Sequence, residues 1–113
     1  MMRQPRQHKP DHLAFVRQLP CVVCMNDIET EAAHIRFGDR RAAKSNPGMQ
    51  AKPDDTWTVP LCGKHHREQH TINEKKFWTS HEIDPLFIAL ALSNVSGNTS
   101  LGLMIVSNAR VKP

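Results

Sequence analysis

Apolar residues recur at helical spacing just after the first ten residues of the chain. In DHLAFVRQLP, residues 11–20, apolar side chains stand at positions 13, 15, 16 and 19. A spacing of three and four residues places side chains on one face of a helix, and Pro20 ends the pattern. Asp11 is a favourable N-cap residue. The segment therefore predicts a short amphipathic helix that begins at Asp11 and ends before Pro20.

Two short apolar segments predict strands on either side of a long polar stretch. The first is EAAHI, residues 31–35, and the second is WTVPL, residues 57–61. Between them, residues 36–56 contain two glycines, two prolines and no apolar periodicity, so we expect a long loop. A loop of this length inside a compact domain is usually functional or disordered.

The second half of the chain predicts helices. CGKHHREQHTINEKKFW, residues 62–78, is rich in helix formers and predicts one helix. Asp84 is a favourable N-cap, with Pro85 at the first position of a helix over 85–94. Further on, GLMIV at 102–106 predicts either a final strand or a frayed terminus. We expect an α+β domain at 11–94, a flexible basic arm at 1–10 and a tail at 95–113.

Composition limits the chain to one modest domain. It has 113 residues, of which 39% are hydrophobic and 23% charged, too few for a second sizeable core. No apolar stretch approaches the roughly 18 residues of a membrane span, and the polar start lacks the apolar centre of a signal peptide. We therefore expect a cytoplasmic protein that makes no contact with a membrane. The net charge of +4 slightly favours a polyanionic partner.

Three cysteines and a histidine have the spacing of a metal site. Cys21 and Cys24 form a C-x2-C pair, and Cys62 with His65 forms a C-x2-H pair. Two close pairs of such ligands are typical of a closed tetrahedral zinc site that stabilises a small domain. An odd number of cysteines in a reducing compartment also favours metal binding over disulfides. The alternative is that the cysteines are small buried hydrophobic residues.

Two more histidines follow on the predicted helix. Residues four apart share a helix face, so His66 and His70 lie together, whereas His65 points back toward Cys62. An ion held by two imidazoles keeps positions open for water and phosphate oxygens, as a hydrolytic site requires. The alternative is that both histidines are solvated surface residues. The pattern therefore predicts a second metal site that is separate from the first.

The order of these elements resembles the HNH endonucleases, which have a ββα-metal fold. The resemblance covers residues 21–78: a strand with AHI, a basic loop, a strand ending in VPLC, and a helix opening with CGKHHREQH. The small zinc-stapled bacterial and prophage members are most similar. The resemblance implies a small ββα-metal core with flanking helices, stapled by a structural zinc.

The same resemblance assigns roles to individual residues. His34 would be the general base that activates water, and His66 and His70 match the H-x3-H ligands of the catalytic ion. Ala33 stands where the family commonly has a further metal ligand. With that ligand missing, either the ion is held by two imidazoles and water, or His34 is itself a ligand. Asp55, with Asp54 as the next candidate, would take the place of the asparagine that orients the base; the alternative is that both aspartates belong to the turn before WTVPL.

These roles predict a metal-dependent endonuclease that hydrolyses phosphodiester bonds in DNA. The reaction needs an activated water, a base and a cation that offsets charge on the phosphate. The catalytic ion would be Mg²⁺, Mn²⁺, Ni²⁺ or Zn²⁺. Basic residues of the loop would contact phosphates without reading sequence, unless they only keep the loop solvated; they are Arg36, Arg40, Arg41 and Lys44.

Two rival hypotheses come from other functional classes. The first is a zinc-stapled nucleic-acid-binding module without catalysis, and Ala33 keeps it open. The second is a structural zinc protein that binds another protein and has no affinity for nucleic acid. RNA and a recruiting protein also stay open as partners.

Overall fold

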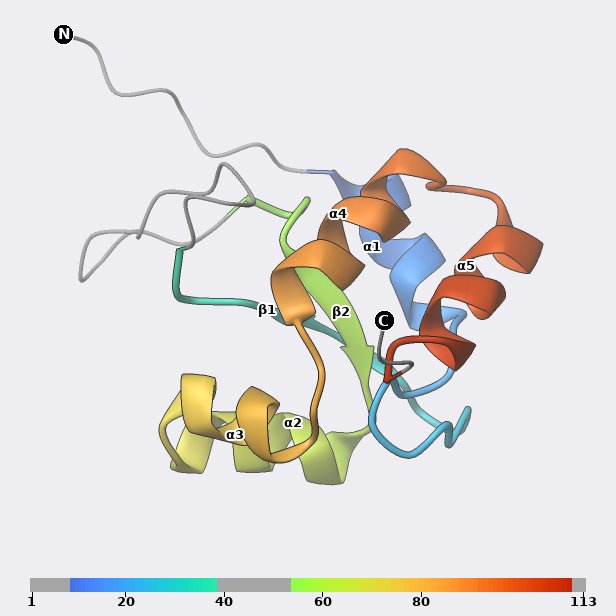
Figure 1. Cartoon of the computed structure of the whole chain (residues 1–113). Coiled ribbons are helices and arrows are strands. Elements are labelled where there is room, and N and C mark those ends of the chain that lie inside the picture. Colours follow the sequence, from blue (N-terminus) through green and yellow to red (C-terminus); the bar gives the residue numbers. More distant parts are fainter. Residues whose placement is uncertain (1–8, 39–53, 111–113) are drawn as a thin grey trace, which may run out of the picture.

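The computed structural model describes residues 9–38 and 54–110. In these ranges the chain forms five helices and a two-stranded sheet, which confirms the predicted α+β class (Figure 1). None of the described helices is long and apolar enough to cross a membrane. The elements, in chain order, are α1 (Pro10–Arg17), β1 (Glu31–His34), β2 (Thr58–Leu61), α2 (Gly63–Thr71), α3 (Glu74–Ser80), α4 (Pro85–Asn94) and α5 (Thr99–Ser107).

The two strands form an antiparallel hairpin at the centre of the molecule. Glu31 lies opposite Leu61, and His34 lies opposite Thr58. Both predicted strands are therefore confirmed. Because the strands are antiparallel, the start of β1 lies beside the end of β2, where the chain enters α2. The hairpin thus brings residues of β1 next to the first turn of a helix about 30 residues further along the chain.

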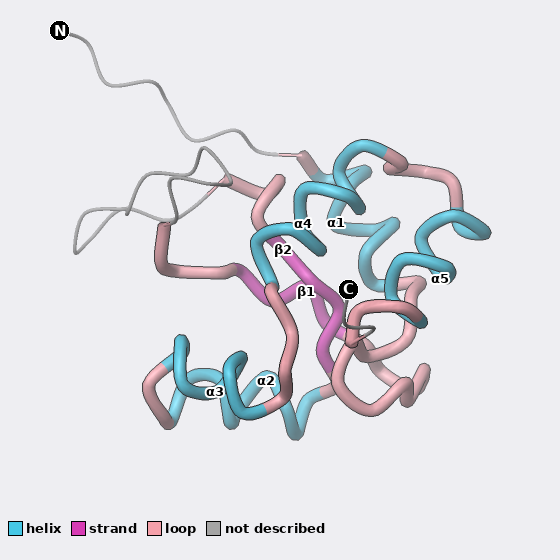
Figure 2. Tube along the Cα trace, in the orientation of Figure 1, coloured by secondary structure: helices cyan, strands magenta, loops and turns pink. Residues whose placement is uncertain are grey.

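Helices pack around this hairpin in two groups. Helix α1 contacts both strands, α4 contacts β2, and α5 packs on α4, whereas α2 contacts both strands and carries α3. Figure 2 shows α2 and α3 together below the strands, with α1, α4 and α5 above and to the right. The largest fully buried side chains include Trp78, Phe77 and Leu86, together with Val59 and Leu61 of β2. The core therefore joins both helix groups through the second strand.

The two helix starts expected at aspartates have different outcomes. Asp84 does cap α4, because its side chain accepts a hydrogen bond from the Phe87 N–H and Pro85 occupies the first turn. At α1 the predicted N-cap is wrong: Lys9 is the N-cap and Asp11 lies in the first turn. A carboxylate there still interacts favourably with the positive end of the helix. Lys9 and Pro10 belong to this folded start, and the rest of the predicted basic arm lies outside the described residues.

The prediction of one helix over 62–78 is also wrong. Helix α2 ends at Thr71, Ile72 is extended, and α3 begins after Asn73. The Asn73 side chain accepts a hydrogen bond from the Lys76 N–H at 3.1 Å. An asparagine that caps a new helix competes with continuation of the old one. The break turns α3 back against α2.

The C-terminal segment is a helix rather than a strand or a frayed end. Asn98 caps α5 by accepting a hydrogen bond from the Leu101 N–H at 3.1 Å. Val106 is 2% exposed and belongs to the same core cluster as the hairpin residues. Gly102 lies against Phe15 of α1 and against Leu19, which lies two residues after the end of that helix. Helix α5 is therefore part of the folded body.

Substitution of Gly102 by alanine tests this packing. A Cβ at position 102 would lie 2.8 Å from Phe15 Cζ and 3.1 Å from the Leu19 methyl groups. Overpacking of this kind costs about 1–3 kcal/mol, against a gain of up to about 1 kcal/mol from helix propensity. We expect Gly102→Ala to lower the melting temperature, and Ser100→Ala, at an exposed position of the same helix, to leave it equal or higher. A stabilised Gly102→Ala protein would contradict the close approach of α5 to α1.

Candidate functional site

The cysteine pairs come from two segments that the fold brings together. Cys21 and Cys24 lie in the turn after α1, whereas Cys62 is the N-cap of α2 and His65 lies in its first turn. The turn is closed by a hydrogen bond from the Met25 N–H to the Cys21 carbonyl at 2.8 Å. The Val22 N–H donates to the Pro60 carbonyl at 2.9 Å, which fixes the turn to β2. The chain therefore places both pairs at the junction of β2 and α2.

The four ligand atoms have the spacing of a tetrahedral metal site. They all lie within 4.8 Å of one another. Cys62 Sγ is 3.2 Å from His65 Nδ1, Cys21 Sγ is 3.7 Å from the same nitrogen, and Cys24 Sγ is 3.9 Å from Cys62 Sγ. Bonds of about 2.3 Å to sulfur and 2.0–2.1 Å to nitrogen give tetrahedral edges of about 3.5–3.8 Å. The group can therefore hold a metal ion, and its three thiols and one imidazole suit zinc.

The surroundings of these groups shift their pKa values in different directions. Burial raises the pKa of Cys21 to about 11, so a nearby cation is needed to deprotonate this thiol at neutral pH. Burial also raises the pKa of Cys62, but the backbone N–H groups of His65 and Lys64 and the neighbouring thiols outweigh it and lower the pKa overall. Burial lowers the pKa of His65, which keeps the imidazole neutral, as a metal ligand must be.

His81 packs against one of the four ligand residues, His65, and the sequence did not predict this contact. Its ring packs edge-on against the His65 ring, with centroids 5.7 Å apart, and also contacts Phe77 at 4.8 Å. Because His81 is the C-cap of α3, the contact links the first turn of α2 to the end of α3. The orientation of the His65 ring therefore depends on the return of α3 against α2.

His66 and His70 lie together on α2, as their spacing predicts. Their Nε2 atoms are 3.2 Å apart, and His66 Nδ1 is 2.7 Å from Glu31 Oε1. A carboxylate on the far ring nitrogen is the usual support of a metal-ligating histidine. Within residues 9–38 and 54–110, no further histidine, cysteine or carboxylate lies close enough to both imidazoles to form a group of three possible metal ligands, as the cysteine group does. Ala33 is fully buried in the core and supplies no ligand.

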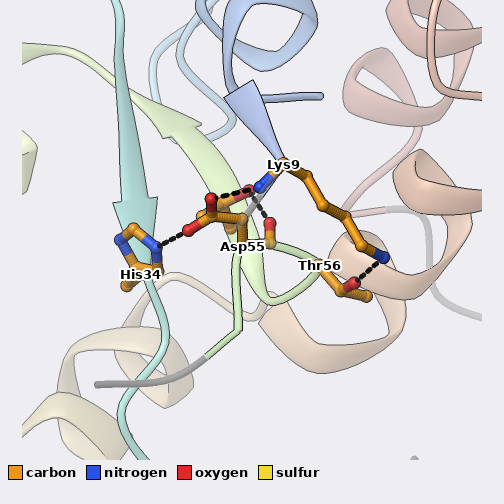
Figure 3. Close-up of polar contacts among 5 residues, drawn as sticks. Lys9, His34, Asp55 and Thr56 are labelled. Carbon is orange, nitrogen blue, oxygen red and sulfur yellow. Dashed lines mark hydrogen bonds and ion pairs between the residues drawn. The ribbon is translucent and has the colours of Figure 1, made fainter. Parts of the chain in front are cut away.

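His34 is held by a buried aspartate (Figure 3). Its Nε2 lies 2.8 Å from Asp55 Oδ1, and Asp55 Oδ2 accepts a hydrogen bond from the Lys9 N–H at 2.7 Å. Asp55 is fully buried, so these partners offset the cost of burying its carboxylate. Of the two aspartates considered from the sequence, Asp55 is the one that the structure places against His34. The main-chain carbonyl of Asp54 accepts from the Trp57 N–H.

Helix α2 runs along β1, the strand that carries His34. At one end, His66 contacts Glu31, the first residue of β1. At the other end, the pKa of His70 is lowered mainly by burial. The neighbouring His66 and the charge of Arg36 lower it further. Between these ends, Gln69 Nε2 donates to the His34 carbonyl at 3.2 Å. The histidine pair therefore lies alongside the strand position of His34.

Glu74 connects three parts of the chain around His34 by hydrogen bonds, and the sequence did not predict this role. Its carboxylate accepts hydrogen bonds from Gln69 Nε2 at 3.0 Å, from the Arg36 N–H at 3.1 Å and from Trp78 Nε1 at 3.3 Å. These donors come from α2, from the segment after β1 and from α3. One carboxylate thus connects the three elements around His34. Of the predicted phosphate-contacting residues, Arg36 lies here, and Arg40, Arg41 and Lys44 lie outside the described residues.

Comparison with known proteins shows the family of the chain. The family model DUF968, described as a protein of unknown function, matches residues 1–95. The chain therefore belongs to this family, and the match includes both histidine groups and the cysteine group. No curated protein and no solved structure matches the chain.

Loss of one ligand tests the metal centre. We expect Cys62→Ser to lose the tightly bound metal and several kcal/mol of folding free energy, because binding of a structural metal contributes directly to folding. His81→Ala is the control, since His81 contacts His65 but is not a ligand. It should keep one metal ion per chain with a modestly lower melting temperature. Elemental analysis and thermal melting of the purified proteins measure both. Unchanged metal content in Cys62→Ser would rule out the site.

Proposed function

We propose that this chain is a metal-dependent endonuclease of the HNH type that hydrolyses phosphodiester bonds in DNA. One observation carries the proposal: His34, held by the buried Asp55, stands on the strand along which the pair His66 and His70 lies. A base and a pair of metal ligands on neighbouring elements are the parts that metal-assisted hydrolysis requires. The hairpin followed by α2 corresponds to the ββα order of that fold.

The cysteine group would hold a structural zinc. Three thiolates and one imidazole occupy all four coordination positions of a tetrahedral ion and leave none for substrate. Its effect is mechanical, since it fixes the first turn of α2 to the turn after α1 and so sets the direction in which α2 presents His66 and His70. In a domain of this size, such a site adds stability that the hydrophobic core alone does not supply.

His34 would act as the general base. When the His34 ring is neutral and donates Nε2–H to the Asp55 carboxylate, its lone pair is on Nδ1. An imidazole held in this way can take a proton from water as it attacks phosphorus, and the carboxylate stabilises the imidazolium that forms. Burial of Asp55 and its hydrogen bond to the Lys9 N–H keep this carboxylate in place.

His66 and His70 would hold the catalytic ion, Mg²⁺, Mn²⁺, Ni²⁺ or Zn²⁺. Their Nε2 atoms, 3.2 Å apart, have the separation of two adjacent ligands of one cation. When bound, the ion supplies a Lewis acid that offsets charge on the phosphate and on the leaving oxygen. Glu31 accepts from His66 Nδ1 and thereby directs Nε2 toward the ion. With Ala33 buried, water and phosphate oxygens would complete the coordination.

A second candidate function is a zinc-stapled nucleic-acid-binding module without catalysis. The observation that favours it is the ligand set of the second site, which contains only two imidazoles among the described residues. This module would bind DNA with a strong dependence on salt and would leave it intact. The two candidates therefore differ in cleavage and agree in binding.

Three histidine variants separate catalysis from folding. We expect His34→Ala and His66→Ala to reduce plasmid nicking in Mn²⁺ by at least about a hundredfold, since each removes a base or an ion ligand. Both should keep one zinc per chain and a cooperative melting transition. His81→Ala is the matched control and should nick at a rate close to that of the parent protein. If both test variants cleave as fast as the parent, the nuclease proposal is wrong.

Glu31→Gln tests the support of the ion. Loss of a carboxylate behind a ligating histidine typically weakens metal affinity by about 10- to 100-fold. We expect the Mn²⁺ concentration for half-maximal nicking to rise by that factor, while the rate at saturating Mn²⁺ falls less and the zinc content stays at one. Glu29→Gln makes the same chemical change two residues away and should leave the Mn²⁺ dependence unaltered. An identical Mn²⁺ dependence in Glu31→Gln and parent would show that Glu31 does not act on the ion.

A further inference from the structure

One of the four groups of the metal centre is open to solvent, and the other three are buried. Cys24 is exposed, as are residues 25–29, which follow it in the turn. Cys21 is fully buried, Cys62 is 7% exposed and His65 is 9% exposed. A structural zinc site does not require any of its ligands to face solvent. Cys24 is therefore the sulfur of this group that a solute in water reaches first.

The exposed sulfur also contacts a sulfur of another segment. Cys24 Sγ lies 3.9 Å from Cys62 Sγ, across 38 residues of the chain. A disulfide needs the two sulfur atoms about 2 Å apart, so these two have only about 2 Å still to approach. An accessible thiol beside a second, resolving thiol is the arrangement of redox-sensing cysteines.

We infer that Cys24 and Cys62 form a peroxide-sensitive pair, whose oxidation to a disulfide releases the metal ion. As metal ligands, both sulfurs are thiolates, the nucleophilic form. Cys24 attacks hydrogen peroxide, so that an S–O bond forms, the O–O bond breaks and hydroxide leaves. Cys62 then attacks the Cys24 sulfur, an S–S bond forms and a second hydroxide leaves. The two thiolates lose two electrons, the peroxide gains two, and protons from the buffer convert both hydroxides to water.

The new bond would join the same two segments that the metal centre joins. Cys24 belongs to the turn after α1 and Cys62 is the N-cap of α2. Of the four ligands, Cys21 and His65 would remain, and two ligands do not complete a tetrahedral site. Oxidation therefore exchanges one crosslink for another, and a thiol reductant with zinc reverses it. A disulfide between Cys21 and Cys24 would lie within the turn and leave α2 unfastened.

This inference rests on the structural-zinc part of the proposed function and needs no DNA cleavage. Purified, zinc-loaded protein is treated with hydrogen peroxide, and zinc release is followed with a colour-forming chelator. Free thiols are then alkylated, and mass spectrometry of protease fragments shows which sulfurs are joined. We expect one zinc to leave each chain, Cys24 to be joined to Cys62, and Cys21 to carry the alkyl group. The oxidised protein should keep a cooperative melting transition, and dithiothreitol with zinc should restore the parent form.

Two variants test which sulfur reacts first. Cys24→His keeps a ligand of the kind already present at His65 but removes the exposed thiol. Peroxide should release its zinc at least about tenfold more slowly, since access controls thiol oxidation. Met25→Leu removes the neighbouring sulfur, which is 37% exposed, and should lose zinc at the parent rate. If Cys24→His binds no zinc, a sulfenic-acid probe on the parent decides, because the first label must appear on Cys24.

Separate results would reject separate claims. Zinc retained by the parent after peroxide treatment, a disulfide between Cys21 and Cys24, or a first sulfenic label on Cys21 or Cys62 would each overturn the inference. A parent protein that holds no zinc before treatment would reject the metal centre itself. Zinc release through the Cys24–Cys62 bond in a protein that never nicks DNA would retain the inference and reject the nuclease.

Discussion

The close approach of three sulfur atoms and one imidazole nitrogen is the constraint on which the rest of the structure depends. Cys21 and Cys24 lie about 40 residues before Cys62 and His65, and the group fastens the turn after α1 to the start of α2. Without a cation, Cys21 would stay a neutral thiol, because burial raises its pKa to about 11, and thiols make only weak hydrogen bonds that would hold the two segments together poorly. Metal binding and folding are therefore expected to be one event.

Helix geometry then divides neighbouring histidines between two tasks. One residue along α2 turns the side chain by about 100°, so His65 faces the cysteines while His66 faces Glu31 and His70. The position of the first turn consequently fixes the position of the pair. Glu74 makes the coupling tighter, because it binds Gln69 of the same helix and the backbone that follows His34. In the proposed nuclease, the cysteine group thus orients catalytic groups without touching substrate.

Local patterns predicted the parts of the site that depend on local geometry. The C-x2-C and C-x2-H pairs and the i, i+4 histidines need only a turn or a helix, and the structure brings each of these sets together. Glu31 and Glu74 were missed because their partners, His66 and Arg36, lie 35 and 38 residues away. The hairpin offered a signal for Glu31, since the start of β1 must lie beside the entry to α2. Asn73 and Asn98 were the overlooked signals for the start of α3 and for α5.

The most direct measurement of the central claim is a Mn²⁺ titration of the parent protein, in which zinc content, Mn²⁺ binding and nicking of supercoiled plasmid are followed in the same samples. We expect one zinc per chain to remain throughout, one further Mn²⁺ to bind, and the nicking rate to rise with the same midpoint as that second binding event. Intact plasmid at saturating Mn²⁺, with one zinc still bound to each chain, would contradict the claim that this fold carries a hydrolytic site.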